Sequence, residues 1–391
     1  MQSAAPETPF PAALWLIPGV YFLFVAAEFV VLIRLALTLT EQGASALAVG
    51  TLASAFWLGI FVASLLAHAL VQRLGHARCF LAAMATSALA VVSLMPHAAY
   101  AGWLGGVAVM GLCGGWVWVS GEAWLAEAAP RKRRGLLIGL FETSVGLGML
   151  AGPALLPLAL WAGLPPLAVG LGLMLAGFAC AWPLLGVAEP STGDAGAACE
   201  GEGGTPEWRL LAVPLAAVAA ASGLMESGVS SLLPSVAMRL GFEMQTAAWL
   251  GAFIGAGSAL LQAPFGALAD RIGLRRAMAL AWALVLLATL ALWWWAGAPQ
   301  QVLWPVGFVL GGVGGAVYTL VVIELGHRLG GSALIKAMGL LVTAYTAGTA
   351  GGPLLGGWLF DRAGLPGLAG VLMACGVAGA LLAWRALRHR P

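Results

Sequence analysis

Two glutamates in the middle of long apolar segments are the strongest candidates for chemistry in this sequence. Glu28 lies in an apolar run from 13 to 38, and Glu226 lies in a run from 209 to 233. An ionisable side chain is costly in hydrocarbon, so within a membrane it faces a water-filled cavity or a partner. We therefore expect both carboxyl groups to bind and release protons. The alternative is a structural role, in which hydroxyls or arginines hold each carboxyl group by hydrogen bonds.

A third glutamate, Glu142, is a further candidate for proton transfer. It lies roughly 10 Å from the start of the apolar run from 136 to 158, at about 1.5 Å per helical residue. The third, sixth, ninth and twelfth apolar runs have no charged residue in their interiors, so they can face lipid. The glutamate-containing runs are then expected to face the interior.

Aromatic and hydroxyl side chains accompany the central glutamates. Residues four and seven positions apart share one face of a helix. Side chains on these faces, with an arginine and further interior aromatic residues, form the expected substrate cavity, which comprises Tyr21, Phe24, Arg34, Trp116, Trp118, Ser222, Ser230, Tyr318 and Tyr345. Aromatic rings in such a cavity can stack on an organic molecule or hold a cation.

The composition identifies the surroundings of these residues as a membrane. Of the 391 residues, 61% are hydrophobic and only 9% are charged, whereas soluble domains have about 25% charged residues. The sequence divides into about twelve apolar segments of roughly 20 residues, each long enough to cross about 30 Å of hydrocarbon as a helix. Two-residue alternation is absent, which excludes a barrel. The expected fold is an all-α integral membrane protein with twelve transmembrane helices.

The distribution of basic residues predicts the orientation. Of the 18 Lys and Arg residues, all except Arg34, Arg239 and Arg362 lie on the side that holds both termini. Because loops rich in Lys and Arg remain in the cytoplasm, we expect both termini to be cytoplasmic. The expected location is the bacterial cytoplasmic, or inner, membrane.

The chain is predicted to be one six-helix unit written twice. At an offset of 198 residues Arg73 matches Arg271 and Glu28 matches Glu226, and near an offset of 200 Pro153 matches Pro353. The expected parts are an N-terminal half at 1–188, a polar cytoplasmic linker at 189–208 and a C-terminal half at 209–391. Internal repeats of this kind are typical of alternating-access transporters.

A charged turn from 266 to 276, Gly-Ala-Leu-Ala-Asp-Arg-Ile-Gly-Leu-Arg-Arg, resembles the loop motif of the major facilitator superfamily. In its first-half copy His68 replaces the usual Gly and Gln72 the usual Asp. The resemblance implies a gate on the cytoplasmic face. Glu122 and Glu324 lie near helix ends and are expected to pair with arginines of these loops. The expected gate therefore comprises Arg73, Gly75, Arg78, Glu122, Gly266, Asp270, Arg271, Gly273, Arg275 and Glu324.

Glycines in the fifth and eleventh segments resemble the antiporter motif of proton-driven exporters. The complete form lies at 339–357, and the copy at 139–153 lacks the final Gly pair. The alternative is close helix packing, which small residues at four-residue spacing provide in any helical membrane protein. The residues concerned are Gly148, Gly152, Pro153, Gly348, Gly352 and Pro353.

These patterns predict a secondary active transporter of a poorly characterised, drug/proton antiporter-like branch. The acidic interior disfavours anions, so we expect proton-coupled export of a small amphipathic or cationic organic molecule. A proton-coupled importer or facilitator of a nutrient is the alternative. We expect a monomer whose partners are the substrate, protons and the lipid bilayer, and we expect no cofactor, metal site, nucleic-acid binding or enzymatic activity, because no nucleophile lies beside a base and the five cysteines lack paired spacing.

Overall fold

The computed structural model describes residues 12–95, 99–128, 134–187, 207–294, 302–329 and 331–388. Across these ranges the regular structure is helical and contains no strand. Helices satisfy their backbone hydrogen bonds internally, which lipid requires. The helices are α1 (Leu16–Glu41), α2 (Ala46–Leu74), α3 (His76–Leu94), α4 (Tyr100–Ala128), α5 (Arg134–Trp161), α6 (Pro166–Ala181), α8 (Glu207–Arg239), α9 (Met244–Ile272), α10 (Leu274–Trp294), α11 (Leu303–Arg328) and α12 (Gly331–Arg388), with short 3-10 helices at Ala12–Trp15 and Trp182–Gly186.

Helix α12 corresponds to two of the predicted transmembrane segments. It has 58 residues, which at about 1.5 Å per residue is far longer than a bilayer of about 30 Å requires. The helix is kinked at Gly364, whose φ of 63° is not helical. Pro366 lies two residues further along the chain. Eleven described helices are long and apolar enough to cross a membrane when α12 is counted once. Dividing α12 at the kink gives twelve, and the predicted all-α membrane fold is confirmed.

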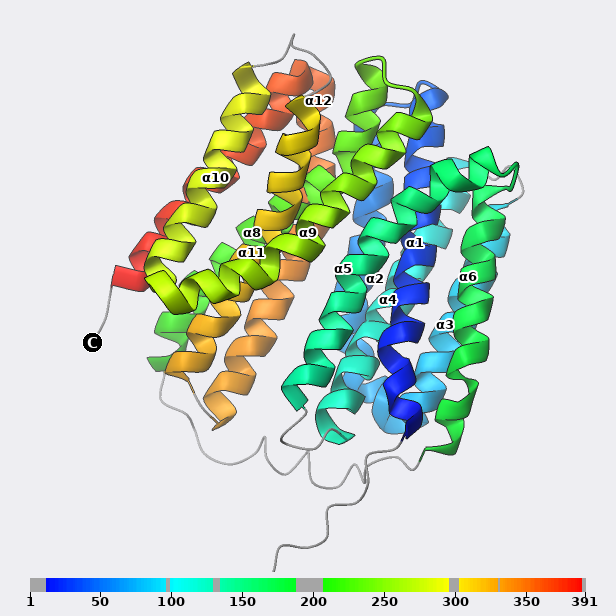
Figure 1. Ribbon diagram of the computed structural model, residues 1–391, viewed down its shortest axis with the longest axis horizontal. Coiled ribbons are helices and arrows are strands. Elements are labelled where there is room, and N and C mark those ends of the chain that lie inside the picture. Colours follow the sequence, from blue (N-terminus) through cyan, green and yellow to red (C-terminus); the bar gives the residue numbers. More distant parts are fainter. Residues whose placement is uncertain are drawn as a thin grey trace, which may run out of the picture.

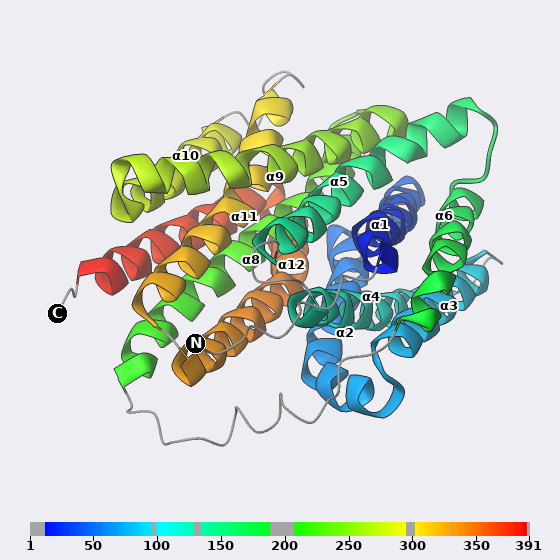
Figure 2. The same ribbon diagram turned by 60° about the horizontal axis from the view of Figure 1, so that its bottom comes forward.

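The helices pack in two groups that use the same contacts (Figures 1 and 2). Helix α1 packs on α5 as α8 packs on α12, and α2 packs on α4 as α9 packs on α11. The two groups meet where α5 contacts α9 and α2 contacts α12. This is the arrangement that a duplicated six-helix unit predicts. Most of the predicted linker, residues 189–206, lies outside the described residues.

The glycines and prolines of the antiporter-like motif lie at these helix contacts. A Cβ atom on Gly148 would lie 2.7 Å from Val25 of α1, and one on Gly352 would collide with the backbone carbonyl of Leu224 in α8. Gly152 and Gly348 approach α1 and α8 in the same way. Pro153 lies against Gly251 of α9, and the carbonyl of Pro353 lies against Gly50 of α2. These small residues bring the helix backbones together both within the groups and between them.

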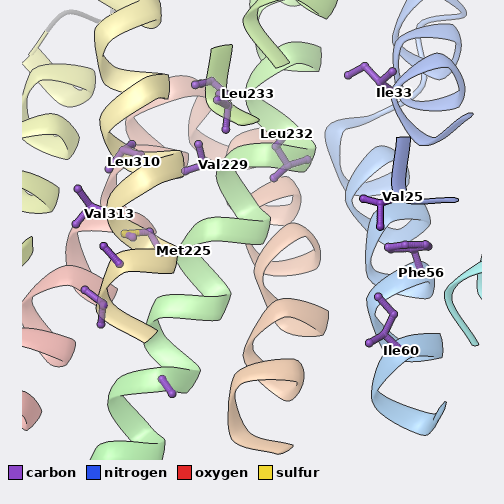
Figure 3. Close-up of a cluster of buried hydrophobic side chains, with 14 of the residues drawn as sticks. Val25, Ile33, Phe56, Ile60, Met225, Val229, Leu232, Leu233, Leu310 and Val313 are labelled. Atoms are coloured by element: carbon purple, nitrogen blue, oxygen red, sulfur yellow. The ribbon is translucent and has the colours of Figure 1, made fainter. Parts of the chain in front are cut away.

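Both groups contribute buried apolar side chains to the core of the molecule (Figure 3). Val25 and Phe56 project from α1 and α2, and Met225 and Val313 project from α8 and α11. The polar side chains of the centre are therefore held by a rigid apolar core.

The two ends of the helical bundle differ in charge. The basic end carries the α2–α3 and α9–α10 turns, where Arg73, Arg78, Arg271 and Arg275 are exposed. Gly75 and Gly273 have φ angles of 80° and 87° in these turns, a conformation that residues with a Cβ rarely adopt. The opposite end carries the α1–α2 and α8–α9 turns, which lie at the upper edge of Figure 1, and the kink of α12.

Candidate functional site

A cavity lies between the two groups of helices at the centre of the molecule, and Glu28 and Glu226 both line it. Its volume is about 110 Å³. The predicted cavity residues Tyr21, Trp118, Tyr318 and Tyr345 line it as well. The cavity therefore brings both central glutamates together with four of the predicted aromatic residues.

A second chamber of about 520 Å³ continues from this cavity toward the basic end. The two chambers share Trp118, Ser258, Gln262 and Tyr318. The second chamber extends to Glu122 of α4 and Gly266 of α9, which lie in the basic-end halves of those helices. The combined space is large enough for a small organic molecule and leads toward the basic end.

The opposite end is held shut by polar contacts between the groups. The Asp361 carboxylate accepts hydrogen bonds from the backbone N–H groups of Ala46 and Leu47, each at 2.8 Å. Arg239 donates to the backbone carbonyl of Ala44. Arg34 Nη1 lies 3.0 Å from the sulfur of Met244. Each contact joins helices α1 and α2, or their connecting turn, to α8, α9 or α12.

Glu28 is buried, with 3% of its surface exposed, and its Oε1 has no hydrogen-bond donor within the described ranges. Its carboxylate lies against Gly114 of α4, where a Cβ atom would be 2.7 Å from Oε1. Gly114 therefore creates the space that this carboxylate occupies. A buried carboxylate without donors is a costly feature that a bound proton, water or ligand would relieve.

Glu226 is also buried, at 6% exposed, but it lies in a hydrogen-bond network. The Tyr345 hydroxyl donates to Oε2 at 2.9 Å, and the Ser258 hydroxyl donates to Oε1 at 3.4 Å. Gln262 Nε2 in turn donates to the Ser258 hydroxyl at 3.3 Å. Gly314 of α11 lies against the Glu226 side chain, as Gly114 lies against Glu28.

The charge of the two chambers is acidic. Glu28, Glu122 and Glu226 line them, and no Lys or Arg of the described residues does. Arg34, which was expected in the cavity, lies at the closed opposite end together with Arg239. The field inside the chambers therefore favours cations more strongly than expected.

Several predicted cavity residues do not line the central cavity in this conformation. Phe24 is fully buried in the core, since it is rotated about 40° from Glu28 around α1, away from the side on which Tyr21 lies. Trp116 packs against the core. Ser222 donates to the Gly314 carbonyl at 2.7 Å and so joins α8 to α11. Arg34 lies at the opposite end, and Ser230 lines a smaller cavity there.

The predicted gate residues do not form ion pairs between helices in this conformation, as far as the chain is described. Glu324 forms a salt bridge of 2.5 Å with Arg328, one turn further along the same helix. Glu122 faces the second chamber, and Asp270 is exposed and forms no ion pair with another residue of the described ranges. The second chamber lies between the two groups of helices at the basic end. Glu142 lies in α5, but its side chain lies outside the described residues.

Sequence reasoning missed several residues of the site. Ser258 and Gln262 are four positions apart on α9, a polar pair whose spacing predicts a shared face. Gly114 and Gly314 match at the 200-residue offset of the repeat. The aromatic residues Phe29 and Phe56 were missed because they resemble ordinary core residues.

Comparison with known proteins agrees with this architecture. A family model described as Major Facilitator Superfamily matches residues 19–258 and 215–391. An uncharacterized MFS-type transporter of Yersinia enterocolitica is 23% identical over 344 residues, which cover 83% of each chain. An uncharacterized MFS-type transporter of Yersinia pestis is 23% identical over 345 residues, again covering 83% of both.

Solved transporter structures share the fold. A bacterial homologue of the human lysosomal transporter Spinster, in an inward-facing and unoccupied conformation, superposes with a TM-score of 0.75 at 14% identity, covering 99% of this chain and 98% of that one. The nucleoside transporter NupG superposes with a TM-score of 0.73 at 11% identity, covering 96% and 99%. The relatives and structures compared above are transporters and not enzymes. The family match spans nearly the whole chain, and the chain therefore belongs to the major facilitator superfamily.

Proposed function

We propose that this protein is a proton-coupled exporter of a small amphipathic or cationic organic molecule in the bacterial inner membrane. The observation that carries the proposal is the central cavity, where two buried glutamates face one space that no described Lys or Arg lines. The excess of basic residues supports a cytoplasmic basic end. The chambers then lead to the cytoplasm, from which an exporter takes its substrate.

The proposed cycle is a competition between substrate and protons. Substrate entering from the basic end binds as Glu28 and Glu226 release protons to the cytoplasm. The helices then close at the basic end and open at the opposite end, where protons rebind the carboxylates and substrate leaves. One chain holds the complete cavity, so a monomer is sufficient for this cycle.

The proposal is tested in proteoliposomes with an imposed pH gradient. Export should follow the gradient in the natural protein, and Glu28→Gln and Glu226→Gln should each abolish gradient-driven transport while leaving the protein folded. Glu41→Gln is the matched control, because Glu41 is exposed at the end of α1. Undiminished proton coupling in the double Gln variant would refute the assignment of Glu28 and Glu226 as the proton-binding groups.

A proton-coupled importer or facilitator of a small polar solute is the second candidate function. The polar lining contributed by Ser227, Gln262 and Thr349 favours it, since these groups can recognise a neutral solute by hydrogen bonds. The direction of net flux in vesicles under opposite gradients separates the two functions.

A further inference from the structure

The two central glutamates have very different surroundings. On the side of Glu28 the cavity wall is apolar and rich in aromatic rings, which belong to Tyr21, Phe29, Phe56, Trp57 and Trp118. On the side of Glu226 the wall carries hydroxyl and amide groups, including Ser258, Gln262 and Tyr345. One half of the cavity is therefore apolar with one charge, and the other half is rich in hydrogen-bonding groups.

The aromatic wall has a fixed shape. Phe56 stands nearly perpendicular to Phe29, with ring centroids 6.4 Å apart, and nearly perpendicular to Trp57, with centroids 5.5 Å apart. Tyr21 is held by parallel stacking on Phe141 at 4.4 Å. Rings fixed in this way lose little conformational entropy when a ligand binds, and their faces attract organic cations.

Of the two central glutamates, Glu28 is the one with a buried carboxylate oxygen that lacks a protein donor in the described part of the chain. Its Oε1 is buried and unpaired within the described part of the chain, whereas both oxygens of Glu226 accept hydrogen bonds from Tyr345 and Ser258. A ligand cation near Glu28 would therefore gain an ion pair without displacing a protein donor. A cation near Glu226 would have to compete with two hydroxyls.

We propose that Glu28 and its aromatic wall bind a single organic ammonium group. The substrate class is an amphipathic monocation, either a protonated amine or a quaternary ammonium with an apolar body, whose polar portion lies toward Ser258 and Gln262. This inference rests on the proposed function, which makes the cavity the substrate-binding site. It adds that Glu28 is the carboxylate that binds the positive charge of the substrate. One free carboxylate in an apolar wall disfavours dications, anions and neutral analogues.

The test is thermal stabilisation of the purified full-length protein by four probes, measured without any gradient. The probes are benzyltrimethylammonium, the dication p-xylylenebis(trimethylammonium), benzyl alcohol and benzoate. The monocation should stabilise the natural protein most strongly. Glu28→Gln should weaken its binding by about tenfold or more, and Glu226→Gln by less than about threefold. Glu41→Gln, outside the cavity, should bind as the natural protein does.

Three further variants, at two positions, keep the test informative if Glu28→Gln does not fold. Gly114→Ala retains the charge but displaces the carboxylate, since its Cβ would lie 2.7 Å from Oε1, and should weaken the monocation. Trp57→Leu removes a ring and should weaken it too, whereas Trp57→Phe should restore most of the binding.

Four results would overturn the proposal: no probe binds, the dication or a neutral probe binds best, Glu28→Gln binds the monocation normally, or Glu226→Gln loses it instead. Monocation binding at Glu28 with no effect of a pH gradient on transport would refute the proposed function and leave this inference standing. If the natural protein shows proton-driven transport but Glu28→Gln binds the monocation as tightly as the natural protein does, only this inference is refuted.

Discussion

Replacing Asp361 by Asn should open the opposite end of the molecule. The carboxylate accepts two backbone hydrogen bonds at 2.8 Å from the first residues of α2, while it projects from α12. An anion at a helix N-terminus is stabilised by the unpaired N–H groups and by the helix dipole. Asn removes the charge and leaves one acceptor oxygen in place of two. The contact exists only while the opposite end is closed.

The size of the effect follows from this geometry. A hydrogen bond to a charged group contributes about 1.5–3 kcal/mol in a buried site, but Asp361 is exposed, so solvent reduces the contribution. We estimate a loss of about 1–2 kcal/mol, with Asn retaining part of the interaction. At 1.4 kcal/mol per tenfold change, the population open at the opposite end should rise about 5- to 30-fold.

Thiol labelling measures this population. Ser230 lines the small cavity near the opposite end, so Ser230→Cys, in a background without the native cysteines, reports opening to an impermeant reagent added from that side. The labelling rate should rise about 5- to 30-fold with Asp361→Asn, because the rate follows the open fraction while that fraction is small. Glu41→Gln, which changes an exposed carboxylate at the same end that makes no contact between the two groups within the described residues, should change nothing. A rate within twofold of the parent, or an equal rise with Glu41→Gln, would refute the reasoning.

Three further predictions concern stability. Gly352→Val should prevent stable folding or lower the melting temperature sharply, since its side chain would collide with the α8 backbone; normal melting would contradict the packing. Gly273→Ala should destabilise by about 1 kcal/mol because φ is 87°, whereas Gly326→Ala, in an exposed helical position with open space, should be neutral or stabilising; equal melting temperatures would argue against a strained turn. Ser222→Ala should cost about 0.5–1.5 kcal/mol by removing the 2.7 Å bond to the Gly314 carbonyl, and Ser230→Ala should cost less, as its hydrogen bond is 3.4 Å long; the reverse order would be evidence against this assignment.

The fold was predictable from sequence because hydrocarbon imposes strong constraints. The length of each apolar run follows from the bilayer thickness, and the cost of buried charge led to Glu28 and Glu226, which the structure places in one cavity. Gly75 and Gly273, which the resemblance to the loop motif singled out, lie in the two turns with positive φ. These features depend on local chemistry that each segment carries by itself.

The details of the cavity were less predictable because they depend on helix rotation. Phe24 and Phe29 are both close to Glu28 in sequence, but only Phe29 lines the cavity, owing to the direction in which α1 packs on α5. Ser222 has the right spacing from Glu226, yet it bonds to a backbone carbonyl of α11. Periodicity in an almost uniformly apolar helix does not distinguish these faces.

The pairing of charges depends on conformation, which sequence does not specify. Glu122 and the loop arginines were expected to close the basic end, but in this conformation Glu122 lines the second chamber and forms no ion pair with another described residue. At the closed opposite end, the charged side chains of Asp361 and Arg239 bond to backbone groups and not to side chains of opposite charge. A pairing rule based on opposite charges misses contacts of this kind.

The central claim is that substrate and protons compete for the buried glutamates, and proton release on ligand binding tests it most directly. Benzyltrimethylammonium is added to the purified protein in weakly buffered detergent solution, and the change in pH is recorded. The natural protein should release protons as the ligand saturates, and the Glu28→Gln, Glu226→Gln double variant should release none. Ligand binding without proton release by the natural protein, or equal release by the double variant, would contradict the account.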